Sequence, residues 1–293
     1  GGAREIVVVS GKGGTGKTSI AASLAVLADR AVIADCDVDA ADLHLILAPG
    51  ARERHEFLGG REAVIREADC TRCGMCLSYC RFEAIRLEGP IGGTGRFMVD
   101  PMACEGCGVC VRFCPAEAIA FPERRCGEWM VSDTRCGPMV HARLDAGAEN
   151  SGKLVSTVRR EAQRIAGEIE CPWVIVDGPP GIGCPVIASI TGAWRVLAVT
   201  EPTVSGEHDL DRILSLARHF RVPALVCVNK WDLNLAVTER IERHAEEWGA
   251  LVVGRVPYDP GVTRAQMAGR AVVETETRSA GAVRQLWNRL MEL

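Results

Sequence analysis

The chain has 293 residues, of which 47% are hydrophobic and 25% are charged, and its formal net charge is −4. These values are typical of a soluble protein with one large domain, or with one domain and a small module, and they give no electrostatic basis for binding nucleic acid. Because no apolar run reaches the roughly 20 residues of a membrane span and no secretory signal is recognised, we expect a cytoplasmic protein without membrane attachment.

Short apolar strands alternate with helical patterns along most of the chain. The first predicted strand, Glu5 to Val9, leads through a glycine-rich loop into a predicted helix from Lys17 to Ala28. Further strands are predicted at 31–34, 173–176, 196–199, 224–228 and 251–256, and helices at 154–169, 210–220 and 238–248. This alternation predicts an α/β fold with a mostly parallel sheet that helices cover on both faces.

The loop after the first strand matches the phosphate-binding motif G-x-x-x-x-G-K-T. It lies between a strand and a helix, which is the context that the motif requires. In such a loop, backbone N–H groups approach the phosphates, the lysine reaches the β and γ oxygens, and the threonine ligates Mg²⁺. The residues predicted to bind nucleotide here are Gly11, Lys12, Gly13, Gly14, Thr15, Gly16, Lys17 and Thr18.

A second lysine, Lys12, gives this loop the sequence K-G-G-T-G-K-T. The sequence resembles the deviant Walker A motif of the MinD, ParA and nitrogenase iron protein superfamily of P-loop ATPases. The resemblance implies that Lys12 crosses a dimer interface and stabilises charge on the partner's transferred phosphoryl group. It thus implies an ATP-dependent homodimer, or a heterodimer with a related ATPase. A solvated loop lysine is the alternative.

Acidic residues follow the second strand in the segment D-C-D-V-D, residues 35–39. This segment resembles the D-x-D segment of the same superfamily, in which the second carboxylate positions the attacking water. The resemblance assigns that role to Asp37 and makes Lys12, Lys17 and Asp37 the predicted catalytic residues. The two flanking aspartates would tune Mg²⁺ or cap the next helix, or would be structural only.

The segment V-I-V-D-G-P-P-G, residues 174–181, resembles the Walker B and switch II region of these ATPases. By this resemblance Asp177 holds Mg²⁺ through water, together with Thr18. Gly178 and Gly181 would allow the segment to respond to the γ-phosphate.

The identity of the base is ambiguous in the sequence. Residues 229–232 read N-K-W-D and match N-K-x-D, the guanine-reading motif of GTPases. In the superfamily, however, an asparagine at the place of Asn229 contacts adenine, and the loop Pro257, Tyr258 and Asp259 flanks the base. The deviant loop and the D-x-D segment outweigh one four-residue match, so we expect ATP and ADP.

Cysteine is the one strong departure from average composition, because eight of the 14 cysteines lie between positions 70 and 114. They form two C-x₂-C-x₂-C-x₃-C runs that are 34 residues apart. This is the bacterial ferredoxin pattern, in which the fourth cysteine ligates the other half's 4Fe-4S cluster. One predicted cluster has Cys70, Cys73, Cys76 and Cys114 as ligands, and the other has Cys80, Cys104, Cys107 and Cys110. The spacing fits zinc pairs less well.

We therefore expect an inserted α+β ferredoxin module at residues 67–121, within a P-loop domain formed by residues 3–66 and 122–293. The whole chain resembles MinD-superfamily ATPases with an inserted ferredoxin domain, which are related to Mrp and to the nitrogenase iron protein. The segments 149–155, 201–203 and 208–210 add to this resemblance.

The resemblance implies an ATPase whose nucleotide state gates electron transfer through two clusters to a partner redox protein. Two alternatives stay open. One is a scaffold or carrier of iron-sulfur clusters, although the C-terminal C-x-x-C of related carriers is missing. The other is a MinD-like regulatory switch in which the clusters sense redox state.

Two further features lie outside these motifs. Cys184 follows Asp177 by seven residues, the offset at which the nitrogenase iron protein places a ligand of its subunit-bridging cluster. A third cluster held by Cys136 and Cys184 of two subunits is therefore a hypothesis. An apolar stripe at helical spacing near the C-terminus favours core packing over a membrane-anchoring helix, and comprises Val283, Leu286, Leu290 and Leu293.

Overall fold

A computed structural model describes residues 2–89, 95–145, 148 and 152–293. The chain divides into two compact units. The first comprises Gly1–His55, Glu128–Leu144 and Asn150–Leu293, and the second comprises Glu56–Gly127 and Asp145–Glu149. The segment 67–121 lies within the second unit.

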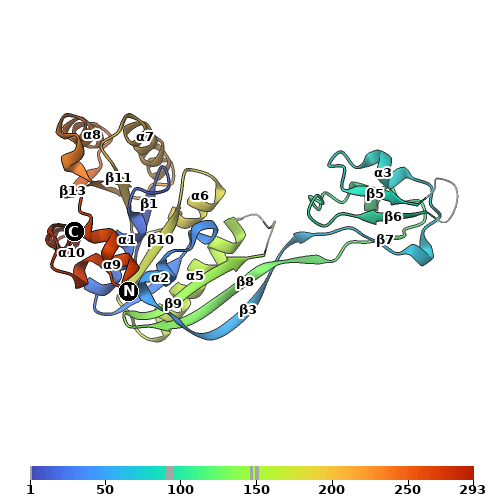
Figure 1. The fold of residues 1–293 in the computed structure, drawn as a ribbon, viewed down its shortest axis with the longest axis horizontal. Helices are drawn as coiled ribbons and strands as arrows, with labels where there is room; N and C mark the ends of the chain where they lie inside the picture. The colour runs from blue at the N-terminus through green and yellow to red at the C-terminus, as the bar shows by residue number, and fades with distance from the viewer. Residues whose placement is uncertain (1, 90–94, 146–147, 149–151) are drawn as a thin grey trace. The chain divides into compact units, whose positions relative to one another are not determined.

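The first unit is built on a nine-stranded sheet with the order β13-β12-β11-β1-β10-β2-β9-β8-β3 (Figure 1). Its seven consecutive parallel strands are β1 (Arg4–Ser10), β2 (Ala31–Asp35), β9 (Gly137–Leu144), β10 (Trp173–Pro180), β11 (Arg195–Thr200), β12 (Ala224–Asn229) and β13 (Leu251–Val256). The prediction of a mostly parallel sheet is thus confirmed, and each predicted strand is present.

Three strands at the other edge were not predicted. They are β3 (Gly50–Arg61), β8 (Glu123–Thr134) and β9, and two residues connect β8 to β9. Most side chains of β3 are exposed, and charged residues interrupt all three segments. Their sequences therefore lack the apolar runs that identify the buried strands.

Helices cover both faces of the sheet. One face packs against α1 (Lys17–Leu27) and α10 (Arg278–Met291), with α2 (Leu43–Leu47) and α9 (Gly261–Met267) nearby. The other face packs against α5 (Gly152–Glu168), α6 (Cys184–Ile190) and α7 (Val204–His219), while α8 (Leu235–Glu247) packs on β12 and β13. Helices α7 and α8 begin earlier than predicted because Thr203 and Asn234 cap them.

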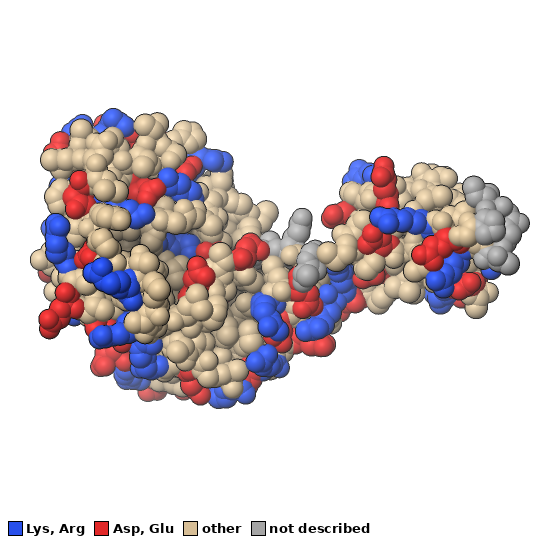
Figure 2. Space-filling view, in the orientation of Figure 1, with Lys and Arg blue, Asp and Glu red and all other residues tan. Residues whose placement is uncertain are grey.

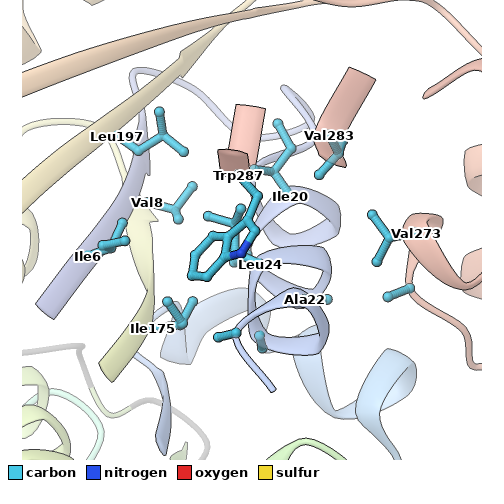
Figure 3. Packing of buried hydrophobic residues seen from close by; sticks show 14 of the residues in the cluster. Ile6, Val8, Ile20, Ala22, Leu24, Ile175, Leu197, Val273, Val283 and Trp287 are labelled. Carbon is cyan, nitrogen blue, oxygen red and sulfur yellow. The ribbon is translucent and has the colours of Figure 1, made fainter. Parts of the chain in front are cut away.

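The core on the α1 face joins alternate residues of the strands to α1 and α10. Ile6 and Val8 of β1 pack with Leu24 of α1, and Trp287 of α10 lies beside them (Figure 3). Of the C-terminal stripe, three members are buried and only Leu293 is exposed; the buried ones are Val283, Leu286 and Leu290. The stripe is a packing surface.

The second unit contains two small antiparallel sheets and two short helices. Strand β4 (Val64–Ile65) pairs with β7 (Ile119–Ala120), and β5 (Ile85–Glu88) pairs with β6 (Arg96–Val99). The helices are α3 (Met75–Tyr79) and α4 (Val109–Arg112).

Surface charge is mixed on the face of the molecule that Figure 2 shows, where basic and acidic side chains are interspersed. Within the described part of the chain, no helix is long and apolar enough to cross a membrane.

Candidate functional site

The glycine-rich loop opens on a cavity of about 390 Å³ at the carboxyl ends of β1, β2, β10 and β12. This volume lies in the usual range for small-molecule sites. Predicted residues that line it are Gly13, Gly14, Thr15, Gly16, Lys17, Thr18, Asp37, Asn229, Pro257, Tyr258 and Asp259. Gly11, Lys12 and Asp177 do not line it. Three lining residues on α9 were not predicted from the sequence, namely Val262, Thr263 and Gln266, because only the tertiary fold brings this helix to the loop.

The loop ends at Gly16, whose backbone is left-handed with a φ of 90°. A Cβ atom at this position would lie 2.4 Å from Nδ2 of Asn229, so a larger residue has neither the backbone conformation nor the space. That Nδ2 atom donates a hydrogen bond of 2.7 Å to the carbonyl oxygen of Thr15. Asn229 therefore holds the loop in shape and also faces the cavity.

Lys17 is buried between two carboxylates. Its Nζ atom lies 2.7 Å from Oδ2 of Asp37 and 3.0 Å from Oδ1 of Asp177, and the three side chains are each less than 10% exposed. Burial acts to lower the pKa of Lys17, but the two carboxylates outweigh it and the pKa is raised. The lysine is thus charged at neutral pH.

A third carboxylate, Asp35, is the strand-to-strand neighbour of Asp177 in the register of β2 and β10. Burial and the charge of Asp177 raise the pKa of Asp35 well above its usual range, and burial also raises the pKa of Asp177. Among the described residues, Oδ2 of Asp35 and Oγ1 of Thr15 are buried without a hydrogen-bond partner. Three carboxylates around one lysine form a site that an added cation would stabilise.

The chemistry of this donor set fits Mg²⁺, which binds proteins through few side chains and keeps several waters. The Thr18 side chain lies close enough to Asp177 to lower the pKa of that carboxyl, so the two residues predicted to hold Mg²⁺ lie together. Within the described ranges, no group of three or more His, Cys, Asp or Glu side chains converges on one ion position. Phosphate oxygens and water would supply the remaining ligands.

The side chains of the N-K-W-D segment, residues 229–232, contact the glycine-rich loop and the loop after β13, and the Asp232 carboxylate does not face the cavity. Asn229 accepts the backbone N–H of Lys230 at 3.0 Å, and Lys230 Nζ donates to the carbonyl of Gly14 at 3.2 Å. Oδ1 of Asp232 accepts the backbone N–H of Tyr258 at 2.6 Å, and Asp232 does not line the cavity. The carboxylate that reads guanine in a GTPase thus holds the loop after β13.

The eight clustered cysteines face two separate cavities. One is lined by Cys70, Cys73, Cys76 and Cys114, and the other by Cys80, Cys104, Cys107 and Cys110. These are the two sets predicted from the ferredoxin spacing, including the exchange of the fourth cysteine between halves. Each cavity is thus lined by one predicted set, although within the described residues no group of three or more cysteines is arranged to hold a metal ion.

The 34-residue repeat is also present in the backbone. Left-handed residues occur in pairs that are 34 positions apart, namely Arg72 and Gly106, Gly74 and Gly108, and Glu83 and Glu117. The two halves also bond reciprocally, because Arg66 N donates to Ala118 O and Asp100 N donates to Ala84 O. The unit is thus a structural duplication.

One sulfur atom accepts a backbone hydrogen bond, whereas burial keeps two other cysteines in the neutral thiol form. The backbone N–H of Ala118 donates to Sγ of Cys114 at 3.3 Å, a contact of the kind that tunes cluster potential. Burial raises the pKa of Cys76 to about 11 and raises that of Cys110. A metal that coordinates these thiols would deprotonate them.

The hypothesis of a third cluster at Cys136 and Cys184 is wrong. Cys136 is buried at the turn before β9, and the register of Met139 with Ile33 places it beyond the start of β2. Cys184 begins α6, after the carboxyl end of β10. Since β2, β9 and β10 are parallel, Cys136 lies at the amino ends of these strands and Cys184 at their carboxyl ends, so the two cysteines of one chain cannot share a cluster. Of the segment 149–155, residues 149–151 lie outside the described part of the chain.

Comparisons with known proteins agree with this geometry. Residues 6–272 match the family model described as the CobQ/CobB/MinD/ParA nucleotide binding domain. An uncharacterised protein of Methanocaldococcus jannaschii is 31% identical, with 98% of this chain and 96% of that protein covered. The chain is also similar to the Pyrococcus furiosus cell division ATPase MinD, with a TM-score of 0.59, 17% identity, and 99% and 98% of the two chains covered.

A similar structure is the septum site-determining protein MinD of Pyrococcus horikoshii in complex with Mg-ADP. It has a TM-score of 0.58 and 16% identity, and 98% of this chain and 96% of that chain are covered. The fold, the phosphate loop and the match to the family model lead to the same assignment. The chain belongs to the CobQ/CobB/MinD/ParA family of nucleotide-binding proteins.

Proposed function

We propose that the protein is an ATPase that dimerises with ATP and carries two 4Fe-4S clusters, and that its nucleotide state gates electron transfer to a partner redox protein. The observation that carries the redox part is the pair of cavities, each lined by four cysteines in the exchanged combination. In this proposal residues 67–121 are a ferredoxin module inserted in the P-loop domain, and the relation is to Mrp and the nitrogenase iron protein.

The nucleotide cavity supports ATP binding and hydrolysis. Lys17 supplies a buried cation where the β and γ phosphates would lie, next to Asp37 and Asp177. When Lys17 turns to the phosphates, Asp37 is released to position water, and Asp177 with Thr18 is released to hold Mg²⁺ through water. Lys12 would then reach the nucleotide of a second copy.

The loop contacts support ATP over GTP. A carboxylate that discriminates guanine has to face the base, whereas Asp232 does not line the cavity and its Oδ1 accepts the N–H of Tyr258. Asn229 and the loop 257–259 line the cavity and are available to the base. In this proposal the amide of Asn229 and the backbone of residues 257–259 would recognise adenine.

The second unit supports transfer of single electrons. Cys76 and Cys80 lie four residues apart, at α3 and its C-terminal end, and line different cavities. Tyr79 and Phe113 pack between the two helices, with their ring centroids 5.0 Å apart. When bound, the clusters would supply low-potential one-electron chemistry at two neighbouring positions.

Reconstitution of the purified protein under anaerobic conditions tests the proposal. We expect about eight iron atoms per chain, four for each cluster. Cys73→Ser should remove about half of them, whereas the matched control Cys126→Ser, which changes a cysteine outside both cavities, should remove none. One or two metal ions per chain would contradict the redox part of the proposal.

Electron paramagnetic resonance of the dithionite-reduced protein tests the coupling. We expect Mg-ATP to change the spectrum or the midpoint potentials of the clusters, and Lys17→Ala to abolish that change while the clusters remain. Identical spectra and titrations with and without nucleotide would refute gating, even if the protein hydrolyses ATP.

A further inference from the structure

Glu201, the residue after β11, pairs with two lysines from two different loops. Its Oε1 atom lies 2.6 Å from Nζ of Lys12, and its Oε2 atom lies 3.1 Å from Nζ of Lys230. The Glu201 side chain is only 15% exposed. Burial opposes ionisation, but the bonds from the two lysines outweigh it and lower the pKa of Glu201. The carboxylate is therefore charged at neutral pH and faces two cations.

Both lysines belong to the framework of the nucleotide loop. Lys12 is part of the loop and also donates to Oγ of Ser205, in the first turn of α7, at 3.2 Å. Lys230 donates to the carbonyl of Gly14, and its own backbone is left-handed with a φ of 55°. This backbone conformation is uncommon for a residue other than glycine. The contacts of the Lys230 side chain with Glu201 and Gly14 hold it in place.

The two lysines differ in how firmly they are held. Lys230 is fixed by its bond to Gly14 and by the hydrogen bond from its own N–H to Asn229. The Lys12 side chain is 35% exposed, and its partners are Glu201 and Ser205. Lys12 is therefore the member that can leave Glu201 without disturbing the loop, while Lys230 remains to balance the carboxylate.

From this geometry we infer that Glu201 is a positioning residue that holds Lys12 within its own chain and thereby sets the protein concentration at which the nucleotide-bound chains dimerise. The inference rests on the proposed role of Lys12 across a dimer interface. To contact the phosphates bound by a second copy, Lys12 has to leave the carboxylate of Glu201 in its own chain. The pairing with Glu201 therefore opposes dimerisation until nucleotide is present in the partner.

The first test measures Lys12 directly in the nucleotide-free protein. The rate at which an amine-reactive acetylating reagent modifies Lys12 is followed by peptide mass spectrometry. We expect Glu201→Gln, which keeps the shape but removes the charge, to raise this rate roughly fivefold. Glu201→Asp, which keeps the charge, should restore most of the protection. The control Glu207→Gln, which breaks the pair between α7 and Arg240 of α8, should leave the rate unchanged.

The second test measures dimerisation by analytical ultracentrifugation with a non-hydrolysable ATP analogue and Mg²⁺. We expect Glu201→Gln to dimerise at roughly fivefold lower protein concentration than wild type, and Glu207→Gln at the wild-type concentration. If Glu201→Gln leaves the labelling rate of Lys12 unchanged, the inference about Glu201 is wrong. It is also wrong if labelling is faster but the protein concentration at the midpoint of dimerisation is unchanged. Neither result contradicts the proposed function. If the wild-type protein forms no dimer with nucleotide, the proposed function is wrong. The labelling test is done without nucleotide and does not depend on that result.

Discussion

Replacement of Lys17 by methionine should destabilise the first unit in a way that depends on pH. The substitution leaves Asp35, Asp37 and Asp177 buried together without their cation. Removal of one partner from a buried ion pair typically costs about 3–5 kcal/mol. We expect about 3 kcal/mol at pH 7.5, because two of the three carboxylates already have raised pKa values and take up protons readily.

The sign of the pH dependence follows from those raised values. A carboxyl group whose pKa is higher in the folded than in the unfolded protein binds its proton on folding. Its folded form is therefore favoured at low pH, and stability falls as pH rises from about 3.9, the ordinary value, through the raised folded pKa. Without the charge of Lys17, the pKa values of Asp35 and Asp177 in the folded protein rise further. The loss of stability in Lys17→Met should therefore be smaller at pH 5 than at pH 7.5.

Urea unfolding followed by tryptophan fluorescence measures this effect in the unit concerned, because all six tryptophans lie in the first unit. Lys12→Met is the matched control, since it removes a lysine of the same loop that is 35% exposed. Such a pair usually contributes about 0–1 kcal/mol. A Lys17→Met protein as stable as wild type without nucleotide, or one with the same loss at both pH values, would refute the electrostatic reasoning.

Three other predictions test other parts of the structure. Arg159→Met, which leaves the buried glutamate of β1 unpaired, should cost about 3–5 kcal/mol in urea unfolding, whereas Arg164→Met on the exposed side of α5 should have no measurable effect; equal losses would contradict this. Gly16→Ala should weaken binding of a fluorescent ATP analogue at least tenfold, because its methyl group would clash with Asn229; unchanged affinity would show that the loop adapts. Burial lowers the pKa of His141 to about 4, so this histidine by itself should remove roughly 2 kcal/mol of stability from wild type as pH falls from 6.5 to 4. The difference in stability between wild type and His141→Gln should change by that amount over this pH range; parallel pH profiles would contradict the prediction.

The local sequence was sufficient for the parts of the fold that carry a strong periodic signal. The buried strands of the parallel sheet are short apolar runs, and all of those predicted are present. The strands β3, β8 and β9 escaped prediction because their charged residues resemble a polar connection. Pairing with neighbours, not composition, makes them strands.

The motifs also identified most of the nucleotide site, since phosphate-binding loops have fixed spacing and a fixed position between strand and helix. The sequence could not reveal that Asp35 and Asp177 are neighbours in the sheet. They are far apart along the chain, and only the strand order, which places β10 beside β2, brings them together. Nor could it show that α9 lines the cavity or that Asp232 is occupied by the Tyr258 N–H. These facts depend on contacts between distant segments.

The cysteines show the same division most clearly. Their spacing alone determined the two sets of four, and the cavities group them in the same way. For Cys136 and Cys184 no spacing rule exists, and only the parallel register of β2, β9 and β10 showed that they lie at opposite ends of these strands. Sequence thus determined what short-range spacing encodes, whereas the tertiary structure decided the contacts that depend on strand order and register, because these bring together residues that are far apart along the chain.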